Sequence, residues 1–191
     1  MDKQFWEEKY SNHQTGWDIG HISTPLKTYI DQLDNKGLTI LIPGAGNAYE
    51  AEYLVRHGFK NVTIVDWVET AISNLQSRMP DFPKDNLLCK DFFELDGHFD
   101  LIIEQTFFCA IPKKRREDYV NKCYSLLNDG GKLAGLLFNN PMNDPDPPIG
   151  GTYEEYLALF SNHFQIKTLE LCHNSIPPRA GNELFFIFKK K

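Results

Sequence analysis

Short, unbroken apolar runs alternate along the middle of the chain with segments whose apolar residues recur at helical spacing. The runs occupy residues 38–42, 61–66, 87–89, 99–104 and 130–138. Helices are expected at about residues 50–58, 69–78, 112–127 and 153–161. Strands that are apolar on both faces are typical of a parallel sheet covered by helices on each side. The alternation of strand and helix therefore predicts an α/β fold.

Two further helices are predicted before the first of these strands. In residues 2–10, Trp6 and Tyr10 are four positions apart and share a helix face. The second helix is expected to have Thr24 as its N-cap and Pro25 in its first position.

The segment between these helices, HQTGWDIGHISTP at residues 13–25, is polar and broken by glycines, with Trp17 in its middle. A bulky aromatic side chain on such a segment either covers the core or contacts a ligand.

The C-terminal part ends in two strands, at residues 164–172 and 183–189. The link between them is too short for a crossover helix, so this pair should be antiparallel. The long stretch at 139–151, rich in proline and glycine, is expected to be a functional loop. The whole pattern predicts a doubly wound, seven-stranded, mostly parallel sheet with an antiparallel C-terminal strand. We expect a single domain over residues 1–191.

Composition limits the classes of partner. The 191 residues carry a net charge of −6, and the basic blocks at 113–116 and 189–191 stand alone. This charge argues against general binding to nucleic acid or to an anionic membrane. There is no apolar run near the roughly 18 residues of a membrane span and no apolar leader. We expect a cytoplasmic monomer.

The four cysteines do not have the spacing of a zinc site. Three of them fall inside apolar runs, so Cys89, Cys109, Cys123 and Cys172 are expected to be reduced, buried thiols, and no metal site is expected.

The sharpest stretch for chemistry is LTILIPGAGNAYEAEYLVRHGFKNVTIVD, in which a strand, a turn with Gly44 and Gly46, a helix and a second strand lead to Asp66. In a doubly wound fold this arrangement brings backbone next to a nucleoside and places a carboxylate near its ribose hydroxyls. Tyr49 stands where a dinucleotide site has its third glycine. A nucleoside without a pyrophosphate is therefore favoured, and S-adenosylmethionine is the commonest of these. A plain strand-to-helix turn is the alternative.

Several motifs in order then resemble one family. They are WEEKYSNHQTGWDIGHISTPL, LIPGAG, VDWVETAI, KDFFEL, FDLIIEQTFFCAIP, LLNDGGKLAGLLF and PPRAGNE. Together they are similar to class I S-adenosylmethionine-dependent methyltransferases, within the thiopurine, thiol and halide methyltransferase group.

The resemblance implies a cofactor site beneath an N-terminal cover formed by residues 1–37. Aromatic residues would enclose S-adenosylmethionine, the glycine turn would pass under its methionine part, and acidic residues would hold its ribose and adenine. The implied cofactor-binding residues are Trp6, Tyr10, Trp17, Gly44, Ala45, Gly46, Asp66, Trp67, Asp91, Phe92 and Gln105.

The resemblance also places a small-molecule methyl acceptor near Phe107, Phe108 and Arg179. In the place of Gln105, plant halide and thiol enzymes have tyrosine and thiopurine enzymes have arginine, so the acceptor is left open among thiols, thiopurines, halides and metalloid oxyanions.

Two physical properties of the reactants are consistent with such a site. Aromatic faces attract the cationic sulfonium of the cofactor by about 0.5 to 2 kcal/mol. A thiol of pKa near 8.5 supplies some thiolate at neutral pH. Transfer to a thiol, the expected function, therefore needs alignment more than a base, and we assign no catalytic residue.

Single residues have simpler alternatives. Phe107 and Phe108 could belong to the core, Asp91 could cap a turn, and Arg179 could pair with Glu183. For the whole chain, the alternatives are a non-catalytic nucleoside-binding module and a nicotinamide-dependent oxidoreductase.

Overall fold

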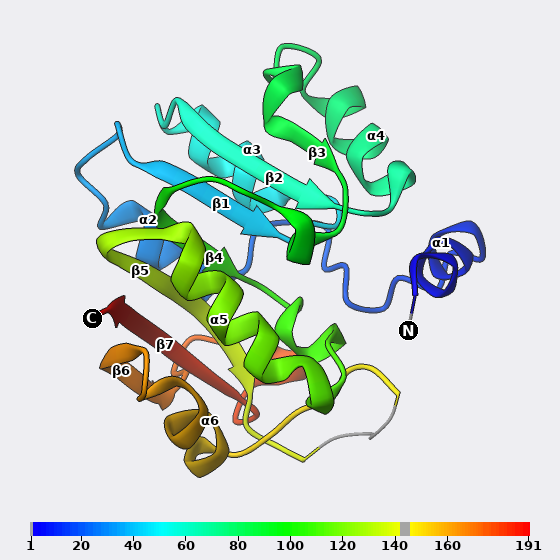
Figure 1. Cartoon of the computed structure of the whole chain (residues 1–191). Coiled ribbons are helices and arrows are strands. Elements are labelled where there is room, and N and C mark those ends of the chain that lie inside the picture. Colours follow the sequence, from blue (N-terminus) through cyan, green and yellow to red (C-terminus); the bar gives the residue numbers. More distant parts are fainter. Residues whose placement is uncertain (1, 142–145) are drawn as a thin grey trace. The chain divides into compact units, whose positions relative to one another are not determined.

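The computed structural model describes residues 2–141 and 146–191, and the chain divides into two units, Met1–Leu95 and Asp96–Lys191 (Figure 1). The single domain expected from the sequence stays a prediction.

The first unit contains three strands and four helices among its described residues. In chain order they are α1 (Lys3–Ser11), α2 (Thr24–Asp31), β1 (Thr39–Pro43), α3 (Tyr49–Arg56), β2 (Asn61–Asp66), α4 (Glu69–Arg78) and β3 (Leu87–Cys89). The strand order is β3-β2-β1, and both pairings are parallel. The connections β1–α3–β2 and β2–α4–β3 run in the same direction across the three strands. Because connections between parallel strands are right-handed, α3 and α4 lie on the same face of these strands. The carboxyl ends of β1 and β2 therefore open at the same edge.

Helix α2 begins one residue earlier than the sequence indicated. Ser23, not Thr24, is the N-cap, and Pro25 still lies in the first turn. The fixed φ of proline suits this turn, where backbone N–H groups have no helical partner. Leu26 and Ile30 are fully buried, so the apolar face of α2 agrees with the predicted spacing.

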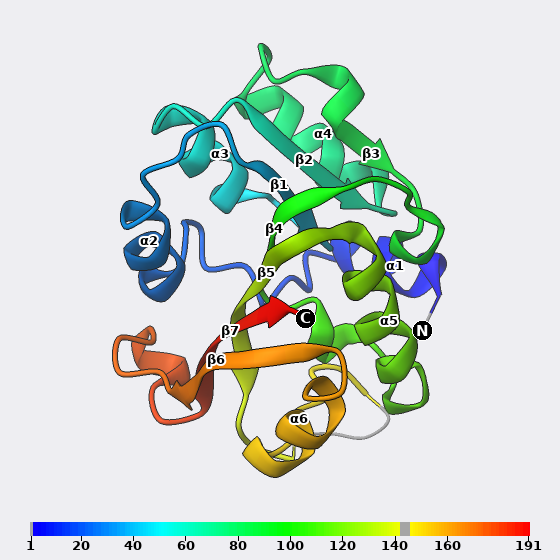
Figure 2. The ribbon, with the colours of Figure 1, turned by 60° about the vertical axis from the view of Figure 1, so that its left-hand side comes forward.

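The second unit contains four strands and two helices among its described residues. They are β4 (Phe99–Glu104), α5 (Arg116–Leu126), β5 (Leu127–Phe138), α6 (Tyr153–Phe160), β6 (Phe164–Leu171) and β7 (Glu183–Lys190). The strand order is β4-β5-β7-β6, with β7 between β5 and β6 (Figure 2). β4 and β5 are parallel, whereas β7 is antiparallel to both of its neighbours.

The seven strands and their directions confirm the predicted α/β class with an antiparallel C-terminal strand. β7 reverses direction because only a short link, with a turn at Pro177–Arg179, separates it from β6. The predicted loop at 139–151 includes residues 142–145, which lie outside the described residues, so its functional role stays a prediction.

Aromatic side chains fill much of the interior of the second unit. They are Phe108, Tyr119, Tyr156, Phe160, Phe164, Phe186 and Phe188, each at most 1% exposed. Neighbouring aromatic rings attract one another through edge and stacking contacts, which stabilise this interior in addition to the burial of apolar area.

Cys109, Cys123 and Cys172 are buried thiols as expected, but Cys89 is exposed, so the prediction for Cys89 was wrong. Cys89 is the last residue of β3, the outer strand of the first unit, where its side chain reaches solvent. Within the described residues, no group of His, Cys, Asp and Glu side chains has the arrangement of a metal site. No helix there has the length and apolar character needed to cross a membrane.

Candidate functional site

The turn after β1 is left-handed at several positions. Gly44 has φ 56° and Gly46 has φ 53°. The N–H of Gly44 donates to the carbonyl of Val65 on β2 at 2.8 Å. A Cβ atom on residue 46 would lie 3.3 Å from the Tyr10 hydroxyl oxygen and 3.9 Å from the Trp17 indole nitrogen. Glycine at this position thus permits both the backbone conformation and the close approach of two aromatic side chains.

Asp66, the last residue of β2, is held by the backbone on both of its carboxylate oxygens. The N–H of Gly46 donates to Oδ2 at 3.0 Å, and the N–H of Val68 donates to Oδ1 at 2.9 Å. Burial raises the pKa of Asp66, and these hydrogen bonds oppose that rise. The Trp67 N–H is a third backbone donor to this carboxylate. A carboxylate has about four acceptor positions, so one position remains for a hydroxyl group of a ligand.

Aromatic side chains gather beside this turn. Trp17 meets Trp6 edge to face at a centroid distance of 5.4 Å and meets Tyr10 at 5.8 Å. Tyr10 is buried with Val68 and Ala71. The half-buried side chains that pack against this core are Trp6, Trp17 and Trp67. The structure therefore brings together the aromatic residues that the sequence placed around the cofactor.

Asp91 and Phe92 lie at the start of the next turn in the first unit. The Asp91 carboxylate accepts from the Phe93 N–H at 2.9 Å, so the alternative in which Asp91 caps a turn describes its contact here. Phe92 is buried. Their predicted contact with adenine stays a prediction.

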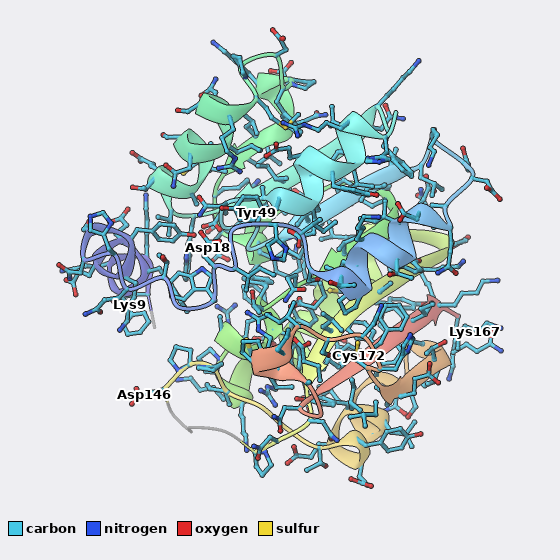
Figure 3. The ribbon with its side chains drawn as sticks, turned by 180° about the vertical axis from the view of Figure 1, so that it is seen from behind. Lys9, Asp18, Tyr49, Asp146, Lys167 and Cys172 are labelled. Atoms are coloured by element: carbon cyan, nitrogen blue, oxygen red, sulfur yellow. The ribbon has the colours of Figure 1, made fainter. Side chains whose placement is uncertain are left out.

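A polar network that the sequence analysis missed ties the 13–25 segment to the glycine turn. The Asn47 amide donates to the Asp18 carboxylate and accepts from Asn74 at 2.9 Å. Arg78 donates to the Asn47 carbonyl. Asp18 also lies beside Tyr49, at the start of α3 (Figure 3). We call the Asp18–Asn47 contact the latch.

The latch joins residues 29 positions apart, so no local pattern reveals it. The sequence offered two weak signals for this contact. Asn47 directly follows the glycine turn, and Asp18 is an acidic residue inside the 13–25 segment. By holding the segment on the turn, the latch keeps Trp17 among the other aromatic side chains.

In the second unit, a pocket opens beyond the carboxyl end of β4. It is lined by Gln105, Thr106, Phe108, Cys109, Leu136, Leu137, Phe138, Tyr156 and Glu183. The lining is mostly apolar with a few polar groups, and the free space in this structure is about that of one water molecule. Burial raises the pKa of the Cys109 thiol to about 12, so this thiol stays protonated at neutral pH.

The predicted acceptor residues of the second unit have structural partners. Phe108 packs edge to face on Tyr119 at 5.0 Å, while Phe107 is half-buried. Arg179 pairs with Glu183 at 3.5 Å, which confirms the ion-pair alternative. Direct contact of these residues with an acceptor stays a prediction.

The residues of the first unit fit a nucleoside that carries a positive charge. Aromatic faces gather at the glycine turn, and a carboxylate with an acceptor position left is held at the end of β2. The missing side chain of Gly46 lets Tyr10 and Trp17 approach the backbone of the turn closely. Cation–π attraction and hydrogen bonds to hydroxyl groups are the interactions that such a ligand requires.

Comparison with known proteins finds a matching family. The model of the thiopurine S-methyltransferase family matches residues 1–186. A probable thiol methyltransferase 2 of Arabidopsis thaliana is 26% identical, over 97% of this chain and 84% of the relative. A thiopurine S-methyltransferase of Vibrio campbellii is 24% identical, over 85% and 83% of the two chains.

A solved structure shares the fold. It is a 1,6-didemethyltoxoflavin N1-methyltransferase of Burkholderia thailandensis with bound S-adenosylhomocysteine, at a TM-score of 0.76 and 19% identity, covering 99% of this chain and 87% of that one.

The latch is predicted to restrain the 13–25 segment. Asp18→Ala removes the acceptor of the Asn47 amide, so the segment should open more often. A hydrogen bond of about 1 kcal/mol corresponds to roughly fivefold faster chymotrypsin cleavage after Trp17 under native conditions.

Asn47→Ala should also speed cleavage, because it removes the same latch contact. Each variant loses one further hydrogen bond, from the Gly20 N–H to Asp18 or from Asn74 to Asn47. The effect of the double variant should therefore be smaller than the sum of the two single effects.

Asp31→Ala, which removes a carboxylate that binds Lys27 and Tyr53 elsewhere in the unit, is the matched control. Equal cleavage rates in Asp18→Ala and wild type would show that the latch does not restrain the segment.

Proposed function

From the premise that the chain belongs to the thiopurine S-methyltransferase family, we propose a separate role for each of its two units. The protein is an S-adenosylmethionine-dependent methyltransferase that acts on a thiol-type acceptor. We assign cofactor binding mainly to the first unit and the acceptor pocket to the second.

The hydrogen bonds that fix Asp66 beside the glycine turn support the cofactor assignment most directly. S-adenosylmethionine, when bound, supplies the methyl group and carries it on a cationic sulfonium. Trp6, Tyr10 and Trp17 would face that charge, and Asp66 would accept a hydrogen bond from a ribose hydroxyl. Burial raises the pKa of Tyr10, so its ring remains neutral beside the cation. Contacts from Trp67, Asp91, Phe92 and Gln105 complete the proposed site.

The second unit is proposed to orient the acceptor and exclude water. Its pocket is largely apolar, and its own thiol, Cys109, stays protonated. An acceptor thiol with a pKa near 8.5 provides its own thiolate, so no side chain needs to remove a proton during transfer. Alignment of the reactants can lower the barrier by about 7 to 11 kcal/mol. Phe107, Phe108 and Arg179 are the residues we place around the acceptor.

The surroundings of the protein are also part of the proposal. The net charge of −6 and the isolated basic blocks favour a cytoplasmic protein that acts on small molecules and does not bind nucleic acid. We further propose that it works as a monomer, since each proposed site is assigned to residues of one chain.

Asp66 is predicted to contribute strongly to cofactor affinity. Asp66→Ala removes the acceptor of a ribose hydroxyl and the partner of the Gly46 N–H. Loss of a hydrogen bond to a charged group costs about 1.5 to 3 kcal/mol, so the dissociation constant of S-adenosylhomocysteine should rise by roughly tenfold or more. Isothermal titration calorimetry measures this change. Asp81→Ala, an exposed carboxylate in the same unit, should bind as wild type does. Unchanged binding by Asp66→Ala would remove Asp66 from the site.

Because the proposal assigns no catalytic base, the pH dependence of kcat/KM should follow the pKa of the acceptor thiol. For a series of small thiols with different pKa values, kcat/KM should rise with pH and level off near the pKa of each thiol. Steady-state assays with labelled cofactor measure these profiles. A single plateau pH shared by all thiols would instead indicate a titrating group of the protein that acts as a base.

A further inference from the structure

Glu104, the last residue of β4, lies wholly inside the second unit at 0% exposure. Its Oε1 accepts from the backbone N–H groups of Phe107 and Phe108, each at 2.8 Å. Its Oε2 accepts from the Tyr119 hydroxyl at 2.7 Å. Three neutral donors from two elements thus converge on one buried carboxylate.

The backbone held by Glu104 is an unfavourable turn. Thr106 has φ 58°, in the left-handed region that a β-branched residue rarely adopts. Such a conformation is unfavourable and persists only where the surroundings enforce it. The two N–H groups directly after Thr106 both point at the Glu104 carboxylate, which supplies that enforcement.

The same turn forms one wall of the pocket. Gln105, Thr106, Phe108 and Cys109 all line it. The Cys109 thiol donates to the Thr106 carbonyl at 3.2 Å, and the Cys109 carbonyl accepts from the Ile149 N–H at 2.7 Å. The conformation of the turn therefore decides where the side chains of residues 105–109 stand around the acceptor.

Glu104 itself is not placed to touch an acceptor. Both of its oxygens are engaged, and its side chain is not among the groups that line the pocket. Any effect on the reaction must therefore pass through the turn.

We propose that Glu104 is a positioning residue, which holds the 105–109 turn in the conformation that shapes the acceptor pocket. This role rests on the proposed function, in which that pocket receives the thiol. The charge of the carboxylate is secondary to its geometry, because two N–H groups and one hydroxyl group can also be satisfied by an amide.

Two substitutions separate geometry from charge. In Glu104→Gln, the amide oxygen can accept from both N–H groups and the amide nitrogen can donate to the Tyr119 oxygen. The Tyr119 hydroxyl can then donate to the neighbouring Cys123. Glu104→Leu keeps a similar volume but leaves both N–H groups without their acceptor. Asp100→Asn, on the same strand and bonded to Asn128 at 2.8 Å, is the matched control.

The experiment measures kcat and KM for a small aryl thiol, the dissociation constant of S-adenosylhomocysteine, and the melting temperature. Glu104→Leu should raise the KM of the thiol about tenfold or more, with S-adenosylhomocysteine affinity within about twofold of wild type. Glu104→Gln and Asp100→Asn should both keep the wild-type KM within about threefold.

Two results would overturn the proposal. One is a Glu104→Leu variant with a wild-type KM. The other is a Glu104→Gln variant whose KM for the thiol rises about tenfold or more, because this result would show that the charge of the carboxylate is needed. The glutamine variant decides the question even where the leucine variant does not fold. Wild-type protein that turns over no thiol would contradict the proposed function instead, whatever the variants do.

Discussion

The hydrogen bond from the Gly46 N–H to the Asp66 carboxylate is the contact on which the cofactor site depends. It joins the turn after β1 to the end of β2, so the position of the carboxylate and the shape of the turn are set together. The turn in turn leaves room for Tyr10 and Trp17, because Gly46 has no side chain. A single contact thus couples the acidic, the backbone and the aromatic parts of the site.

The second unit uses a related device at the end of β4. Glu104, like Asp66, is a strand-end carboxylate that accepts backbone N–H groups, and burial raises the pKa of both. The two differ in what remains free. Asp66 keeps an acceptor position for a ligand, whereas Glu104 has its oxygens engaged by the turn and by Tyr119. Asp66 is therefore suited to direct contact with a ligand, whereas Glu104 is suited to holding the 105–109 turn in place.

The regular elements could be predicted from the sequence because their signals are local. Three strands, Asn61–Asp66, Leu87–Cys89 and Phe99–Glu104, agree with the apolar runs to the residue. Asp66 was found from the pattern of strand, glycine turn, helix and strand, whereas the aromatic cofactor residues were implied by the family resemblance.

What the sequence did not reveal depends on contacts between distant segments. The latch between Asp18 and Asn47 and the engagement of Glu104 by Tyr119 have no local pattern. Cys89 is exposed because β3 is the outer strand of the first unit. The N-cap of α2 is Ser23 and not Thr24, because proline is tolerated at more than one position of the first helical turn.

The three tryptophans of the chain offer the most direct test of the central claim that the cofactor binds at this aromatic cluster. Trp6, Trp17 and Trp67 all belong to the cluster, so the tryptophan emission of the protein, excited selectively over that of tyrosine, reports on it alone. Titration with S-adenosylhomocysteine should give a saturable change in tryptophan emission, with the same dissociation constant as calorimetry. Calorimetric binding without any change in emission would place the cofactor elsewhere and contradict the account.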